Sequence, residues 1–310
     1  MTGAPRALPR YIVVTPVRDE AAYIAETIAS MRAQTHPPLQ WIVVDDGSTD
    51  GTAELLRDGA AGLPWMRVLS RASAQRRLGS AEVLAFQQGC AEIDGDPRWE
   101  FIVKLDGDLR LPPDYFARLL ARMAAAPRSG IASGVYCELQ DGHWQPVAMP
   151  SYHAAGASKV VRRACFDQIG GFVARKGWDT VDEIRAGLAG WETGHHDDIR
   201  FHHLKPEGQA MGRLGTHRFH GEIYHATGGG LGFGLLKAAH RMVVGDPPIV
   251  GGLAMLWGYL VPLALHRPRL VTAPEARFYR GLLRRRWRDA LRRRLRGAAP
   301  APAPAMRDGG

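Results

Sequence analysis

Two carboxylates flank a single glycine in Asp106-Gly-Asp108, directly after the apolar run Phe101 to Leu105. Acids this close repel each other unless they bind a cation, and hard carboxylate oxygens suit Mg²⁺ or Mn²⁺ better than Zn²⁺. The alternative is an ordinary turn, because Asp and Gly are common turn residues. The pair therefore predicts a divalent metal site if other parts of the chain bring ligands to it.

A second pair of acids, Asp45 and Asp46, follows the apolar run Gln40 to Val44 in the same way. A third pair, Asp179 and Asp182, is three residues apart at the start of a helical pattern, so both side chains share one face of its first turn. A carboxylate placed there could accept a proton from an attacking hydroxyl. The alternative is that these acids only cap the helix and complement its dipole.

The elements that must position these acids alternate along the chain. Apolar runs typical of strands are followed by amphipathic helical patterns, and the runs cover residues 11–15, 40–44, 66–69 and 101–105. This alternation predicts an α/β fold with a doubly wound, mostly parallel, Rossmann-like sheet. Because parallel strands end at one edge, Asp45, Asp46, Asp106 and Asp108 should face one crevice. A sugar nucleotide matches such an edge, since it offers hydroxyls to one pair and a metal-bound diphosphate to the other.

Three motifs in this order, Pro16-Val-Arg-Asp-Glu20, Val44-Asp-Asp-Gly-Ser-Thr-Asp50 and Lys104-Leu-Asp-Gly-Asp108, resemble the nucleotide-sugar-binding half of family 2 glycosyltransferases, which have the GT-A fold. The resemblance covers roughly residues 10–215 and implies an inverting, nucleotide-sugar-dependent enzyme. It implies that Asp108 binds the metal, with Asp106 on the ribose or acting through water. The nucleotide-sugar site would contain Pro16, Arg18, Glu20, Asp45, Asp46, Lys104 and Asp106. The family often has Pro-x-Tyr-Asn-Glu where this chain has Pro-Val-Arg-Asp-Glu, so contacts to the base should differ.

The resemblance also assigns the acceptor side. Counting back from Gly190 places Asp179 at the catalytic base, with Trp178 where the family has Glu, and Asp182 is the rival. We expect Ile184 and Leu188 of this helix to face inward. The family can supply a histidine to the metal or diphosphate, and His202 or His203 is the candidate.

The sequence leaves the roles of two further groups of side chains open, the histidines and a set of basic residues. The histidines could suggest a zinc site, but they lack the His-Glu-x-x-His pattern and have no cysteine partner. A structural role is the alternative for His195 and His196. The basic residues Lys159, Arg162 and Arg163 either contact phosphate or an anionic acceptor, or form a solvated basic face.

The positive charge of the chain is concentrated near its C-terminus. The formal net charge of the 310 residues is +9, and residues 277–296 contain ten arginines and one acid, which accounts for all of it. A basic appendage on a neutral body favours an acidic surface as partner over nucleic acid in a catalytic groove. Three scattered cysteines without CxxC spacing favour a reducing compartment, so we expect a cytoplasmic location.

The C-terminal third predicts membrane-associating helices. Residues 249–265 contain no charge, but this run falls short of the about 20 residues that span a bilayer, so we expect it to be interfacial or partly embedded; packing into a core is the alternative. Residues 276–296 form an apolar stripe among arginines, suited to an anionic membrane interface. Glycines in 227–234 indicate a hinge before a helix.

We therefore expect an N-terminal tail (1–9), a GT-A domain (10–225, with nucleotide-sugar binding in 10–110 and the catalytic part in 111–225), a helical membrane-associating region (226–296) and a disordered tail (297–310). The leading hypothesis is a metal-dependent glycosyltransferase at the inner face of the cell membrane, acting on a lipid-linked or surface-polysaccharide acceptor. The alternatives are a non-enzymatic membrane or nucleic-acid binder driven by the arginine-rich segment, and an Asp-x-Asp phosphatase. The phosphatase motif requires Thr or Val at the position of Arg110 in this chain, which argues against that alternative.

Overall fold

The chain divides into two compact units, residues 1–209 and 210–310, and each is described by itself. The division falls before the expected domain boundary at 225, because the helix at 212–226 packs against a later helix of the second unit. The computed structural model describes residues 7–71, 80–93, 98–205 and 212–295. The expected disordered tail, 297–310, and most of the expected N-terminal tail lie outside these residues.

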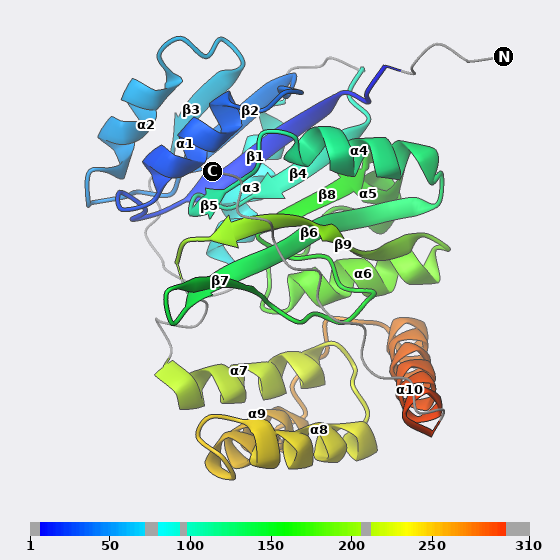
Figure 1. Ribbon diagram of the computed structural model, residues 1–310. Coiled ribbons are helices and arrows are strands. Elements are labelled where there is room, and N and C mark those ends of the chain that lie inside the picture. The colour runs from blue at the N-terminus through cyan, green and yellow to red at the C-terminus, as the bar shows by residue number, and fades with distance from the viewer. Residues whose placement is uncertain (1–6, 72–79, 94–97, 206–211, 296–310) are drawn as a thin grey trace, which may run out of the picture. The chain divides into compact units, whose positions relative to one another are not determined.

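The first unit is built on one sheet with the strand order β3-β2-β1-β4-β8-β6-β9-β5, and β7 pairs with β6 (Figure 1). The first four strands in that order are parallel, as predicted, and β6 and β9 are also parallel. Strand β8 runs antiparallel to both its neighbours, β4 and β6. The strands are β1 (Tyr11–Val17), β2 (Gln40–Asp45), β3 (Met66–Ser70), β4 (Phe101–Leu105), β5 (Leu109–Arg110), β6 (Ser129–Gln140), β7 (His143–Pro146), β8 (Ser158–Arg162) and β9 (Glu192–His203).

Helices cover both faces of this sheet. The helices are α1 (Ile24–Arg32), α2 (Thr52–Ala60), α3 (Ala81–Ala91), α4 (Tyr115–Ala125), α5 (Arg163–Ile169) and α6 (Trp178–Leu188). Side chains of α1, α2 and α4 form one core with alternate strand residues such as Val13 and Val103, whereas α3, α5 and α6 form the other core with Val14 and Ile102. Successive strand residues point to opposite faces, and helices cover both faces. The central strands are therefore apolar along most of their length.

Two details of the first unit differ from the prediction. Leu188, expected to face inward, is 48% exposed, because it lies at the last turn of α6. The histidines between His195 and His203 lie on the long strand β9, which the sequence pattern did not indicate because polar residues dominate it. Parallel pairing with β6 and hydrogen bonds to neighbouring segments hold this polar strand in the sheet.

The second unit consists of helices. They are α7 (Gly212–Ala226), α8 (Leu231–Val244), α9 (Val250–Ala264) and α10 (Ala273–Leu295). Helix α9 packs against α7 and α8, so the uncharged run is partly a core element, and it also exposes apolar residues. In α10, Tyr279 and Leu283 are buried and Trp287 is half exposed. Among the described helices, none is both long and apolar enough to cross a membrane.

Candidate functional site

The end of β4 brings three possible metal ligands together. Strand β4 is buried along its whole length and ends at Leu105, so Asp106 and Asp108 emerge at the carboxyl edge of the parallel strands. Gly107 fits between them because a Cβ there would lie 2.7 Å from a methyl carbon of Val17. His203 arrives from β9, where it pairs with Leu109 of β5. One ligand atom of each of Asp106, Asp108 and His203 lies within 4.8 Å of the others.

A divalent metal ion fits this cluster. His203 Nε2 lies 3.4 Å from Asp108 Oδ2, while Asp108 Oδ1 is buried without a hydrogen-bond partner. A buried carboxylate oxygen without a donor is costly, and a cation between the three side chains would satisfy it. Two carboxylates and one imidazole leave positions for water or phosphate oxygens, as in the Mg²⁺ and Mn²⁺ sites that bind phosphates.

Lys104 balances part of the negative charge behind the cluster. Its side chain is 3% exposed and its ammonium group contacts the carboxylates of Asp106 and, at 3.7 Å, Glu82. Burial raises the pKa of Asp106 to about 7, with Lys104 opposing this shift and Asp108 adding to it. Lys104, expected in the nucleotide-sugar site, is therefore a buried residue that balances part of the charge of Asp106.

The motif at residues 16–20 forms another side of the same edge. Pro16 lies in β1, opposite Val44 of β2. Glu20 forms an ion pair with Lys205, which follows β9, and the distance from Oε1 to Nζ is 2.7 Å. Burial raises the pKa of Glu20, with Lys205 lowering it and Asp108 raising it further. A Cβ atom on Gly107 would lie 3.7 Å from Cγ of Glu20, so Glu20 lies beside the turn that carries Asp106 and Asp108. Lys205 was not singled out in the sequence because no motif surrounds it.

The two acids after β2 have different partners. Asp45 Oδ1 accepts hydrogen bonds from the backbone N–H and the hydroxyl of Ser48, so this oxygen orients the turn. Asp46 lies 3.4 Å from the guanidinium of Arg71, which follows β3. Both acids are nearly fully buried. Arg18 contributes a buried Nε that has no hydrogen-bond partner and lies 3.7 Å from the carboxylate of Asp19, so this part of the edge offers a donor as well as carboxylates.

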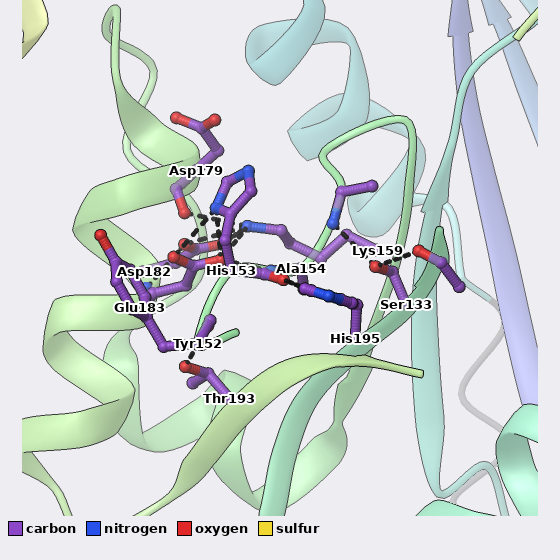
Figure 2. Close-up of polar contacts among 12 residues, drawn as sticks. Ser133, Tyr152, His153, Ala154, Lys159, Asp179, Asp182, Glu183, Thr193 and His195 are labelled. Atoms are coloured by element: carbon purple, nitrogen blue, oxygen red, sulfur yellow. Dashed lines mark hydrogen bonds and ion pairs between the residues drawn. The ribbon is translucent and has the colours of Figure 1, made fainter. Parts of the chain in front are cut away.

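The acids at 179 and 182 lie in very different environments, as Figure 2 shows. Asp179 is partly exposed in the first turn of α6. Asp182 is buried, and both its oxygens accept hydrogen bonds from Lys159 Nζ at 3.1–3.2 Å. Lys159 Nζ also donates to the backbone carbonyl of Asp179 at 2.9 Å, which fixes the turn that carries it. Asp179 is thus the accessible acid and Asp182 the structural one in this geometry.

Lys159 lies at the centre of a buried group of charged side chains that bind one another. Its side chain is fully buried and also lies 3.6 Å from Glu183, which in turn accepts from His153 Nδ1 and from the backbone N–H of Ala154. Burial favours the neutral amine, but the carboxylates of Asp182 and Glu183 raise the pKa of Lys159. Its burial contradicts the solvated basic face considered for Lys159, and its contacts with Asp182 and Glu183 favour a structural role over contact with phosphate or an anionic acceptor.

The two arginines expected beside Lys159 also have structural contacts. Arg162 donates to the backbone carbonyls of Ser129, Met123 and Ala126. The guanidinium of Arg163 lies over the ring of Trp99 at 4.3 Å from its centroid. We therefore do not assign either residue to the substrate site.

Trp178 links the two buried lysines. Lys104 and Lys159 are directly opposite each other on β4 and β8, and their ammonium groups lie 5.3 and 5.1 Å from the centroid of the Trp178 ring. The indole N–H donates to Glu82 at 2.6 Å. This residue, which stands where the resembling family has Glu, therefore connects the metal-side charges to the turn that carries Asp179.

The histidines of β9 divide by position. Successive strand residues point to opposite faces, so His202 and His203 diverge. His203 joins the acids, whereas His202 stacks on Trp144 at 4.1 Å and burial lowers its pKa, with Arg110 adding to the shift. His195 Nδ1 contacts the carbonyl of His153, and His196 Nδ1 lies 3.4 Å from Arg122. The geometry favours His203 as the metal ligand.

Structural comparison identifies the fold. The mannosyltransferase PcManGT from Pyrobaculum calidifontis, solved in complex with GDP-Man and Mn²⁺, is similar with a TM-score of 0.58 at 19% identity, covering 93% of this chain and 82% of that one. The first unit has the GT-A fold.

Sequence comparison identifies the family. The profile of Glycosyl transferase family 2 matches residues 12–177, and the chain belongs to this family of glycosyltransferases. The O-antigen biosynthesis protein RfbC of Myxococcus xanthus is 29% identical over 210 residues, 63% of this chain and 16% of that protein. The undecaprenyl-phosphate 4-deoxy-4-formamido-L-arabinose transferase of Pseudomonas aeruginosa is 31% identical over 141 residues, 43% of this chain and 37% of that protein. The chain spans well under half the length of these curated relatives.

Proposed function

We propose that this glycosyltransferase is metal-dependent and inverting, and that it moves a sugar from a nucleoside-diphosphate sugar to a hydroxyl of a lipid-linked or surface-polysaccharide acceptor. The observation that carries the proposal is the meeting of Asp106, Asp108 and His203 at the carboxyl edge of the sheet. The names of the two relatives, O-antigen biosynthesis and undecaprenyl-phosphate transfer, support the acceptor class.

The residues on the donor side would bind and orient the nucleotide sugar. Asp108, His203 and Asp106 would hold Mg²⁺ or Mn²⁺, which when bound neutralises the diphosphate and stabilises it as a leaving group. Asp45 and Asp46 would accept hydrogen bonds from the base or ribose, and Pro16, Arg18 and Glu20 would line the pocket. Lys104 keeps the acids behind the ligand partly balanced.

Asp179 would be the general base. The acceptor oxygen attacks the anomeric carbon, the bond from that carbon to the diphosphate oxygen breaks with inversion, and the hydroxyl proton passes to the carboxylate of Asp179. Asp182 cannot take this role while both its oxygens bind Lys159. A carboxylate that is partly exposed, on a turn fixed by Lys159, combines access with a defined position.

We further propose that the chain works at the cytoplasmic, inner face of the cell membrane, held peripherally through residues 249–296. The uncharged helix α9 and the arginine-rich α10 support this, because an anionic bilayer attracts basic residues and accepts apolar ones. The same location would give access to a lipid-linked acceptor.

The test is a thermal-shift screen of the full chain with UDP-, GDP-, dTDP- and CDP-sugars, each with and without Mn²⁺. We expect one donor class to raise the melting temperature only when the metal is present. Isothermal calorimetry with the corresponding nucleoside diphosphate then gives the affinity. Absence of metal-dependent binding for all four classes would overturn the proposed function.

A further inference from the structure

Exposed apolar side chains gather in the second unit. Among the described residues, 16 large hydrophobic side chains are exposed, and 13 of them belong to this unit, which is about a third of the chain. In α9, Leu253, Trp257 and Leu260 follow one another at helical spacing and are 50%, 61% and 37% exposed. Eleven of the 13 lie on or next to α8 and α9. They are Leu231, Leu235, Leu236, Val243, Val244, Ile249, Val250, Leu253, Trp257, Leu260 and Leu265.

The closest contacts between the helices of this unit are made at glycines, beside buried aromatic residues such as Tyr224 and Tyr259. A Cβ atom on Gly221 of α7 would collide with the backbone at Met255 of α9, and one on Gly258 of α9 would collide with the backbone at Arg218 of α7. Gly252 of α9 meets Ala238 of α8 in the same way. Close helix contacts at glycines, with large apolar residues also left on the outside, are typical of helices in lipid.

The charge of the unit selects the kind of apolar partner. Residues 210–310 contain 17 lysines and arginines and 5 acids, a formal charge of +12, whereas residues 1–209 carry −3. The acids that the structure describes there are all engaged: Glu222, Asp246 and Asp289 lie within 4.0 Å of arginines, and Glu275 accepts from the backbone N–H of Thr272. The free charge of this surface is therefore positive, as an anionic lipid surface requires.

We propose that the exposed apolar side chains of α8 and α9 are a lipid-inserting face, which enters the interface of an anionic bilayer while the surrounding arginines bind headgroups. This inference rests on the membrane association proposed above and assigns it to the α8–α9 pair as well as to the arginine-rich helix. Helix α9 has 15 residues, so at 1.5 Å per residue it extends about 22 Å, less than the hydrocarbon thickness of about 30 Å. It therefore lies in the interface without spanning the membrane.

The test is flotation of the full chain with phosphatidylcholine vesicles, with and without phosphatidylglycerol, at low and high salt. The variant L253S/W257S removes apolar area and leaves every charge in place. We expect it to reduce partitioning by at least about tenfold at both salt concentrations. The matched control L84S/L139S changes two exposed leucines of the first unit and should leave partitioning unchanged. The variant R284Q/R285Q/R288Q should lose affinity only for anionic vesicles and mainly at low salt.

Three outcomes would overturn the lipid-inserting face. The first is wild-type vesicle binding by L253S/W257S. The second is a wild-type dimer that L253S/W257S converts to a monomer in light scattering, because a second copy would then cover the face. The third is a melting temperature several degrees lower for L253S/W257S than for the control, since the face would then pack within the chain. Mn²⁺-dependent nucleotide binding, measured on the same samples, separates failure of this inference from failure of the proposed function.

Discussion

Two buried lysines, Lys104 and Lys159, face each other across β4 and β8, yet the charges around them differ. Lys104 lies among the carboxylates of Glu82, Asp106 and Asp108, and one oxygen of Asp108 has no hydrogen-bond partner. We call this group unbalanced. Lys159 and His153 lie between Asp182 and Glu183, whose oxygens accept hydrogen bonds from them, and we call this group balanced. The difference teaches that buried charge by itself does not mark a ligand site. A buried carboxylate oxygen without a donor does, because a divalent cation would satisfy it.

The largest effect should come from breaking the balanced group with Lys159→Met. The change leaves Asp182 and Glu183 buried without their main cation, and we expect the free energy of unfolding to fall by about 3–5 kcal/mol. Urea denaturation followed by circular dichroism measures it. The double variant K159M/D182L, which replaces the pair by apolar side chains, should recover much of the loss. A loss below about 1 kcal/mol for Lys159→Met would contradict the balanced-group interpretation.

Next in size is Asp108→Asn, which changes the unbalanced group. We expect Mn²⁺-dependent binding of the nucleoside diphosphate to weaken at least about 100-fold, because a ligand oxygen and one negative charge are lost. Calorimetry measures the affinity, and EDTA should produce a similar loss in the wild type. Asp182→Asn is the matched control: it should lower stability and leave nucleotide binding intact. The same pattern from both variants would remove the distinction between the groups.

Trp178→Phe should have a smaller effect on both groups at once. It keeps a ring between the lysines but deletes the hydrogen bond to Glu82, and we expect a loss of about 1 kcal/mol in stability, together with weaker donor binding. Trp191→Phe deletes an equivalent indole hydrogen bond, to Gln168 on the exposed surface, and should leave donor binding unchanged. Donor affinity that is equal in the two variants would show that Trp178 does not connect the groups.

The smallest effect concerns pH and His153. Burial opposes the imidazolium form, but the charge of Glu183 outweighs it and raises the pKa of His153. A raised histidine pKa stabilises the fold fully below the unfolded value of about 6.5, and this stability is lost as the pH rises through the folded pKa. The stability difference between wild type and His153→Gln should therefore be larger at about pH 6 than at about pH 9. Equal differences at both values would contradict the assignment.

The sequence predicted the donor half of the fold, and the meeting of Asp106 and Asp108 at one sheet edge, because the signals for both are local. Phe101–Leu105 is apolar except for Lys104 and is followed directly by Asp106, and parallel strands bring such ends together whatever the details of packing. The acceptor half depends on pairings that are distant in sequence. The strand β9 alternates only in its last five residues, where Ile199, Phe201 and His203 are buried, and the burial of Lys159 follows from Asp182 and Glu183 on another element. No local pattern distinguishes His202 from His203 until the partners of β9 are known.

The reversed direction of β8 brings a second segment of the chain to the metal edge. Because β8 runs against β4, its first residue, Ser158, pairs with the last residue of β4, Leu105. The segment that enters β8, residues 147–157, therefore arrives at the same sheet edge that β4 leaves, and it carries His153. The end of this segment contacts the metal edge directly, because the backbone carbonyl of Ala157 accepts a hydrogen bond from the N–H of Asp106 at 2.8 Å. Its middle is held by α6, since the N–H of Ala154 donates to Glu183 at 2.8 Å. A change in this segment would therefore be felt at the turn that carries the proposed metal ligands.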